Sequence, residues 1–376
     1  MPPIDALALP ALPAPFWFIE FFKVLGFTLH AVPMNLWYAG VILGVTLSVF
    51  GSQPARRWSA RMFLQMPIVI AAGINLGIVP LLFLQVAYSR AFYPATILMA
   101  WFWFGVIVLL IPAYYGVYLY VSGLRGEAGG MTRVKRAAGW GSAAFFLAIG
   151  FLFANAMSLT TNTAGWAELW ERHNVGAATT GTALNLGDGT LWPRWLLMFG
   201  LALITTAAWS VFDAVWLAKG ESEEYRRWVQ QFATRLAIAG AIASTVFGAW
   251  YVFGTWRKEV FDAMFSSPWI VLTLLTGAMA WLPPLLLWLG RTKNLTHAGV
   301  AAIAAAQVGV LAVNAVSRQV VQNLELQGFF QPGVSAQPVQ TDWGPLVLFL
   351  ATFVLGVGVL AWMFAQLRKV GPETTA

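Results

Sequence analysis

The feature of this chain that most limits its fold is a succession of long apolar runs along its whole length. A helix of about eighteen or more apolar residues is long enough to cross a hydrocarbon layer of about 30 Å. Nine such runs are present, at roughly residues 16–50, 60–88, 93–123, 134–158, 192–218, 227–254, 268–290, 296–317 and 343–367. The sequence therefore predicts an all-α, polytopic membrane bundle of about nine transmembrane helices.

Composition agrees with this interpretation. The 376 residues are 59% hydrophobic and only 10% charged, which is more apolar surface than a soluble core of this size could bury. The longest gaps, about 159–191 and 318–342, are too short to fold alone. We expect a single integral membrane domain over residues 1–376. Residues 1–15 lack the basic segment and cleavage site of a signal peptide, so the first span should remain.

Charge distribution predicts the orientation of the bundle. The net charge is +7, but the basic residues lie at the ends of apolar runs, where they set topology, so nucleic acid is not an expected partner. They follow the odd-numbered runs, at Arg56, Arg57, Arg61, Arg125, Arg133, Lys135, Arg136, Arg226, Arg227, Arg291, Lys293, Arg368 and Lys369. The positive-inside rule then places the N-terminus outside and the C-terminus in the cytoplasm. We expect a multi-pass protein of the bacterial inner membrane.

Four charged residues inside the apolar runs are expected to pair. Asp213 and Arg235 lie in consecutive runs, each about eight residues from the loop between them, so antiparallel packing should bring them together. The pair would be a structural ion pair or an element of a proton relay. Glu20 and Lys23, three residues apart, should pair on one helix face.

The residues able to hold redox cofactors are few. Cysteine is absent, which excludes covalently attached c-type haem, cysteine-ligated iron–sulfur clusters and disulfides within the chain. Of three histidines, only His30 lies deep in an apolar run; His173 falls in a polar interfacial segment and His297 at a helix start. A cytochrome with two bis-histidine haems needs four histidines and is excluded. Methionines are either core fillers or sulfur ligands, and the candidates are Met34, Met99, Met157 and Met198.

A series of short motifs resembles one known family. The run His30-Ala31-Val32-Pro33-Met34-Asn35-Leu36 is similar to the first helix of the haem-bearing subunit (subunit I) of cytochrome bd-type oxygen reductases. Further segments match in order: Gly73-Ile74-Asn75-Leu76-Gly77 with Phe83 and Gln85, Leu98-Met99-Ala100, Phe153-Ala154-Asn155, Ser317-Arg318-Gln319 and Val370-Gly371-Pro372. With the span count and orientation, the chain resembles a divergent relative of that subunit over nearly its whole length.

The resemblance implies a haem site. His30 would be the axial ligand of one haem b or haem d-like group, and Asn155, Arg318 and Gln319 would lie in its pocket. A second haem ligand of the family falls in the neighbourhood of Leu196 to Met198, and its methionine partner has no match near Val271.

Other functional positions of the family are replaced as well. Two carboxylates near the oxygen-binding haem fall on Thr96 and Phe104, and the acidic ligand of a third haem falls on Ala315. Spans six and seven are joined by only about a dozen residues, where the family has a long quinol-binding loop. The phenyl ring of Phe104 cannot relay protons. By this comparison, the chain lacks most of the family's haem ligands and proton-carrying carboxylates.

The function expected from these losses is an accessory or membrane-anchor subunit of a respiratory electron-transfer oxidoreductase complex, non-catalytic or poor in haem. Its partners would be other membrane subunits, with a haem-complete paralogue and a cytochrome c donor as candidates, and lipid. One alternative is an active haem-containing bd-like oxidase or quinone-reactive subunit. Another is a membrane transporter, although the chain shows no convincing internal repeat.

Overall fold

A computed structural model describes residues 11–127, 129–218, 220–291, 295–329 and 339–367. Lys293, Arg368, Lys369 and the Val370-Gly371-Pro372 motif lie outside these ranges. The long helices are α1 (Phe16–Asn35), α2 (Val41–Phe50), α3 (Gln53–Ala87), α5 (Ala100–Leu124), α6 (Arg133–Thr161), α8 (Leu191–Phe212), α9 (Glu223–Thr255), α11 (Ile270–Met279), α12 (Leu282–Gly290), α13 (His297–Leu326) and α14 (Trp343–Leu367). The short elements are α4 (Ser89–Leu98), α7 (Trp166–Arg172), α10 (Lys258–Met264), β1 (Asn174–Val175) and β2 (Ala178–Thr179).

The predicted membrane bundle is confirmed. Within the described residues, nine helical segments are long and apolar enough to cross a membrane. Three of them combine elements. α1 continues through a π-helical turn at Leu36–Gly40 into α2, α8 continues into a π-helical turn at Asp213–Leu217, and α11 is followed closely by α12. Pro33, inside α1, has no N–H, so the carbonyl of Leu29 lacks the backbone hydrogen bond that residue 33 would otherwise donate. The chain is a multi-pass membrane protein.

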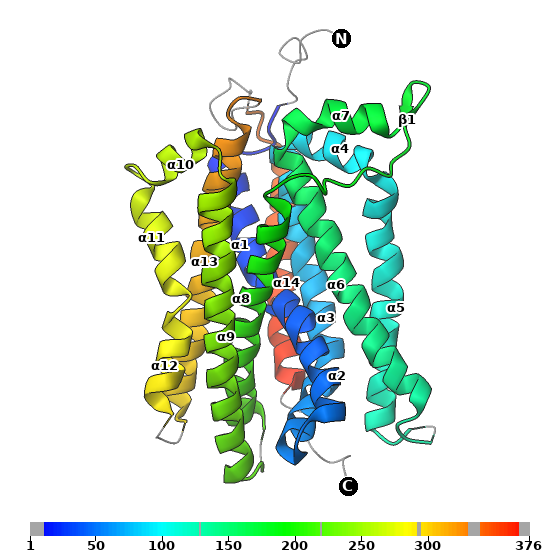
Figure 1. Cartoon of the computed structure of the whole chain (residues 1–376), viewed down its shortest axis with the longest axis vertical. Coiled ribbons are helices and arrows are strands. Elements are labelled where there is room, and N and C mark those ends of the chain that lie inside the picture. The colour runs from blue at the N-terminus through cyan, green and yellow to red at the C-terminus, as the bar shows by residue number, and fades with distance from the viewer. Residues whose placement is uncertain (1–10, 128, 219, 292–294, 330–338, 368–376) are drawn as a thin grey trace.

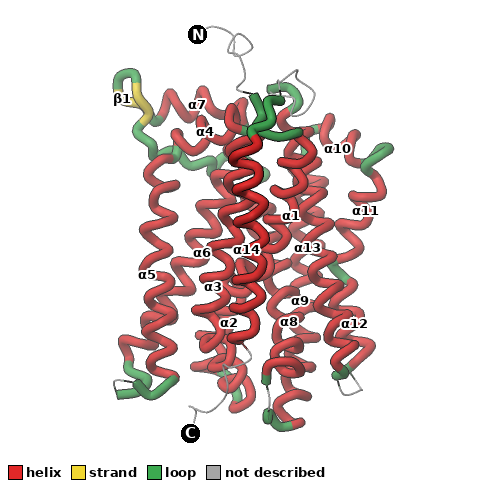
Figure 2. Tube along the Cα trace, turned by 180° about the vertical axis from the view of Figure 1, so that it is seen from behind, coloured by secondary structure: helices red, strands yellow, loops and turns green. Residues whose placement is uncertain are grey.

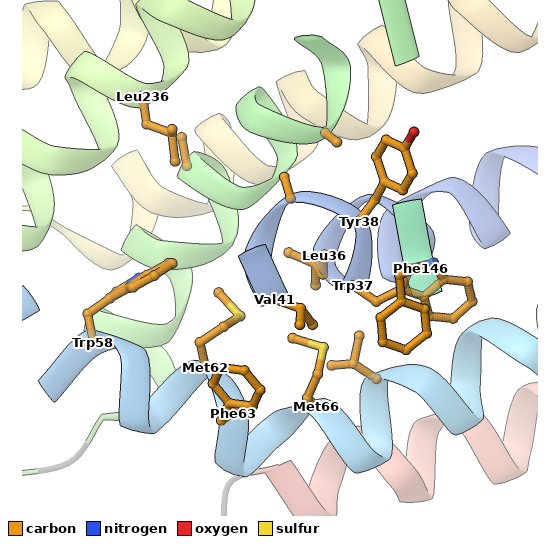
Figure 3. Close-up of a cluster of buried hydrophobic side chains, with 14 of the residues drawn as sticks. Leu36, Trp37, Tyr38, Val41, Trp58, Met62, Phe63, Met66, Phe146 and Leu236 are labelled. Atoms are coloured by element: carbon orange, nitrogen blue, oxygen red, sulfur yellow. The ribbon is translucent and has the colours of Figure 1, made fainter. Parts of the chain in front are cut away.

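The helices pack mainly as antiparallel neighbours, with α8 against α9, α1 against α3 and α5 against α6 (Figure 1). Helix α14 runs along the outside of the bundle in front of α3 (Figure 2). No residue in its most apolar segment is buried. The core lies where α2 and the preceding turn meet α3 and α6 (Figure 3). There the rings of Trp37 and Phe146 stack at 5.9 Å beside Met62, Phe63 and Met66 of α3.

The two ends of the bundle differ. At the end where α1 begins, the short helices α4, α7 and α10 cover the helix termini (Figure 1); we call this the capped end. At the opposite end, the basic end, polar side chains cap several helices. The hydroxyl oxygens of Thr132, Ser222 and Thr296 accept the backbone N–H groups of Lys135, Tyr225 and Gly299.

Two span boundaries and the Asp213–Arg235 ion pair differ from prediction. The third span begins at Ala100 because residues 89–98 form the separate helix α4, and α13 continues to Leu326. Asp213 does not pair with Arg235. Its carboxylate accepts Nε and Nη2 of Arg61 on α3, at 2.7 and 2.8 Å, while Arg235 is exposed on α9.

Candidate functional site

A cavity of about 400 Å³ opens between helices α1, α6, α8, α9, α11 and α13. Most of its wall is apolar, with Phe27 and Ala31 of α1, Leu201 of α8 and Leu311 of α13. Its charged side chains come from the parts of α8 and α13 that lie toward the capped end. Such an apolar chamber with a few polar groups at one end is typical of a site for a small amphipathic molecule.

Arg194 is the best-satisfied charge in the cavity. It forms an ion pair with Oε1 of Glu325, and its Nη2 donates to the hydroxyl of Tyr251 at 2.6 Å. Its Nη1 also reaches Thr161 Oγ1 at 3.3 Å. Arg257 donates to the backbone carbonyl of Glu325 at 2.7 Å. The second carboxylate oxygen, Glu325 Oε2, is buried and has no hydrogen-bond partner in the described part of the chain.

Of the described charged residues that line the cavity, Arg318 forms no ion pair. It lines the cavity and is exposed there, with its guanidinium carbon 4.6 Å from the centre of the Phe27 ring. Among the described residues, no hydrogen-bond acceptor or carboxylate contacts the guanidinium. The face of Phe27 provides only a weak cation–π contact, so Arg318 remains available to an anion.

Lys23 of α1 packs against the neighbouring face of α13. Its Nζ donates to Oε1 of Gln319 at 2.6 Å and of Gln322 at 2.7 Å, and lies 4.1 Å from the centre of the Tyr88 ring. The expected Glu20–Lys23 pair is replaced by these amide contacts. Glu20 instead accepts a hydrogen bond from Nδ2 of Asn323 at 2.7 Å.

Tyr88 joins this network from the end of α3. Gln319 Nε2 donates to the phenol oxygen at 2.6 Å, and the phenol donates to Asn323 Oδ1 at 2.5 Å. Burial, together with the negative charge of Glu20, raises the pKa of Tyr88 above its usual value. The phenol therefore stays neutral and can act as donor and acceptor at once.

His30 lies on the side of α1 that faces α3. Its Nδ1 is 2.8 Å from the carbonyl oxygen of Gly73, and its ring meets Trp37 edge-on at 5.9 Å. Because a carbonyl can only accept, Nδ1 carries the proton and Nε2 keeps its lone pair. Space is tight here, since a Cβ on Gly77 would come 2.8 Å from the imidazole Cε1. His30 is not among the residues that line the cavity.

The remaining predicted residues lie in different places. Asn155 is fully buried on α6, where its Oδ1 accepts the backbone N–H of Asn185 at 3.0 Å. Met34, Met157 and Met198 line the cavity, whereas Met99 is buried in a separate cluster. Of the four predicted site residues, only Arg318 lines the cavity; Gln319 belongs to the Lys23 network.

The fit of the cavity to haem can be judged from its donor atoms. Within the described residues, no group of three or more His, Cys, Asp or Glu side chains could hold a metal ion. The cavity wall contributes methionine sulfurs but no imidazole. His30 has the proton arrangement common in metal-bound histidines, with one nitrogen bonded to a carbonyl and the other free, but it faces α3. The residues of the cavity therefore do not fit a histidine-ligated haem.

Sequence analysis did not single out Arg194, Tyr251 or Glu325. Arg194 and Glu325 lie near the ends of α8 and α13, where charged residues usually meet the membrane surface. Charged residues inside membrane spans need partners of opposite charge. Arg194 at the start of α8 and Glu325 at the end of α13 lie at the same end of the bundle, and this shared depth could have predicted that they pair.

Comparisons with known proteins show a shared fold. No family model matches the chain, and no curated protein matches it by sequence. A chain of the bd oxidase from Geobacillus thermodenitrificans superposes with a TM-score of 0.65, covering 95% of this chain and 100% of that chain, at 9% sequence identity. The chain is similar in fold to bd oxidase. The resemblance predicted from short motifs is thus confirmed at the level of the fold.

Proposed function

We propose that the chain is an accessory or membrane-anchor subunit of a respiratory electron-transfer complex related to the bd oxidases. The observation that carries this proposal is the fold match, which extends over 95% of this chain and the whole of the bd oxidase chain. A match of that extent involves the complete bundle and not one recurring helix pair.

The accessory role is supported by the environment of the key positions. His30 is bonded to the Gly73 carbonyl and lies outside the cavity. At the positions where the resemblance places acidic groups, Thr96 donates to the carbonyl of Phe92 at 2.9 Å, Phe104 is exposed, and Ala315 is buried. Reduction of oxygen requires several electron carriers and titratable groups, and these positions supply neither.

A haem-bearing partner subunit follows from this role. Helices α5 and α14 present large exposed apolar side chains, including Trp101, Ile111, Val354 and Trp362, which suit contact with lipid or with another membrane subunit. Between α9 and α11 the chain has only residues 256–269, which include α10. We propose a haem-complete paralogue as partner, with a cytochrome c as donor in place of quinol.

Purification tests the proposal. The chain carrying an affinity tag, isolated from its native membrane in mild detergent, should copurify with at least one haem-bearing membrane subunit. The same chain produced alone should contain far less than one haem per polypeptide by absorption spectroscopy. One or more haems per isolated chain, or native preparations free of any haem-bearing subunit, would contradict the proposal.

A haem on His30 is the second candidate, favoured by the Nδ1–H to carbonyl bond that leaves Nε2 free. In that case His30→Ala should abolish the haem absorption of the isolated chain. His297→Ala is the matched control, because His297 lies at the start of α13 against the Trp216 ring, 5.1 Å away, at the basic end. An unchanged spectrum in the His30 variant would refute the ligand assignment.

A further inference from the structure

The cavity carries an excess of positive charge. Arg194 and Arg318 line its capped side, and Lys23 lies next to the wall on Gln319 and Gln322 of α13. The charge of Arg318 repels both of the others. Among the described residues, two carboxylates act on these three cations. Glu325 is paired with Arg194, and Glu20 accepts from Asn323. An uncompensated cation within a membrane span is costly, so an anion beside Arg318 would lower the free energy of the site.

The same cavity also offers an acceptor without a donor. Glu325 Oε2 is buried and lacks a partner in the described structure, although the other oxygen of this carboxylate is paired with Arg194. Buried oxygens are rarely left without a donor. A molecule that fits both groups must therefore carry an anionic group for Arg318 and a hydroxyl or N–H group for Glu325.

The shape of the cavity suits an acyl chain. Helix α11 packs against α13 and α12 rather than against α9. Where α9 and α11 face each other, the cavity is lined by Gly248 of α9 and Gly277 of α11. A Cβ added at Gly277 would meet no atom within 4 Å. Val271 and Leu275 of α11 are exposed apolar residues that suit the bilayer. A lipid chain can thus enter sideways between α9 and α11.

The depth of the charges matches a lipid headgroup. Arg318 lies eight residues before the last residue of α13, which places it about 12 Å below the capped end of that helix. Lys23 lies at a comparable depth in α1, seven residues after its first residue. Helix α13 has 30 residues and is about 45 Å long, so both charges fall near the boundary between headgroups and acyl chains.

We propose that this cavity binds one phospholipid of net negative charge whose headgroup carries hydroxyls, as phosphatidylglycerol does. The phosphate binds Arg318, a headgroup hydroxyl donates to Glu325 Oε2, and one acyl chain lies between α9 and α11. A zwitterionic lipid would leave the excess positive charge uncompensated. A free fatty acid has no donor for Glu325 once it is ionised. The site is independent of whether the chain has an accessory or a catalytic role.

Two variants and two matched controls test the site. Arg318→Gln removes the unpaired charge, and Gly277→Leu fills the lateral opening. Arg172→Gln removes an exposed arginine of α7, and Gly358→Leu enlarges a glycine of α14 that also has open space around it. Each full-length chain is purified in mild detergent, and its retained lipids are extracted and quantified by mass spectrometry. Delipidated protein is then titrated with dioleoylphosphatidylglycerol, dioleoylphosphatidylcholine or oleate, and its thermal midpoint is measured.

The wild-type chain should retain about one phosphatidylglycerol-type lipid and be stabilised by dioleoylphosphatidylglycerol alone. Loss of a charge-assisted contact should weaken its affinity about tenfold or more in Arg318→Gln. Gly277→Leu should lose the lipid as well, and both controls should keep it. Equal stabilisation by the zwitterionic lipid, a preference for oleate, a copurified quinone in place of lipid, or retention by the Arg318 variant would overturn the proposal.

Discussion

At the scale of single residues, the contacts made by buried charges are the least predictable feature of this chain. Asp213 lies among donors from α3: Arg61 binds both carboxylate oxygens, and Gln65 Nε2 donates to Oδ1 at 2.7 Å. Depth alone favoured Arg235, but that residue lies on the exposed stripe of α9 with Ile242 and Val246. Sequence gives the depth of a residue in a span, whereas its direction depends on packing with helices distant in sequence.

The Asp213–Arg61 pair should be essential for stability. Replacing Asp213, as in Asp213→Ala, leaves buried Arg61 with only the longer 3.6 Å ion pair to Glu221 and should lower the free energy of unfolding by about 3–5 kcal/mol. Denaturant or thermal unfolding in detergent, followed by circular dichroism, measures the change. Arg61→Ala should cost a similar amount, and the double variant should cost less than the sum of the single variants. Strictly additive losses, or an equal loss in the control Arg235→Ala, would contradict the assignment.

At the scale of elements, the apolar runs predicted each span but not where each span ends. Polar residues after Ser317 suggested a loop, yet α13 continues to Leu326 because Gln319, Gln322 and Asn323 find partners in α1 and α3. The site was predictable only in part for the same reason. Arg318 and Gln319 were identified, but which of these two adjacent side chains faces the cavity depends on the helices packed against α13. The cavity itself is formed by six helices and has no local signal.

Close contact between α8 and α9 depends on two glycines. A Cβ at Gly240 would lie 2.7 Å from the carbonyl oxygen of Gly200 and 3.0 Å from the backbone nitrogen of Ile204, so neither backbone can yield cheaply. Gly240→Ala should separate the helices and lower the free energy of unfolding by about 1–3 kcal/mol. In Gly105→Ala on α5, where the added Cβ meets nothing within 4 Å, stability should hold or rise slightly. Unfolding measurements that rank the two variants in the opposite order would refute this explanation.

At the scale of the whole molecule, alternation of the basic loops agrees with the arrangement of the bundle. The connections from α2 to α3, α5 to α6, α8 to α9 and α12 to α13 all lie at the basic end (Figure 1). Arginines and lysines gather in these connections and in the first turns of the helices that follow them, whereas the capped end has mixed charges, as in the Glu168–Arg172 pair. The fold is shared at only 9% sequence identity. This is possible because a membrane bundle depends mainly on the apolar length of its spans and on the charges at their ends, and many different residues preserve both.

The predicted orientation can be measured with reporter fusions. The loop between α5 and α6 contains Arg125, and the hairpin of β1 and β2 contains Gly176. By the positive-inside rule, a green fluorescent protein fused after Arg125 should fluoresce and alkaline phosphatase at the same point should be inactive. Fused after Gly176, the two reporters should show the reverse. Since Gly176 follows one further span, the pattern must alternate whichever way the chain inserts. Phosphatase activity after Arg125 with fluorescence after Gly176 would therefore show that the orientation is the reverse of the predicted one. The cationic cavity would then lie in the cytoplasmic leaflet, and a cytochrome c outside the cell membrane could not donate electrons at the capped end.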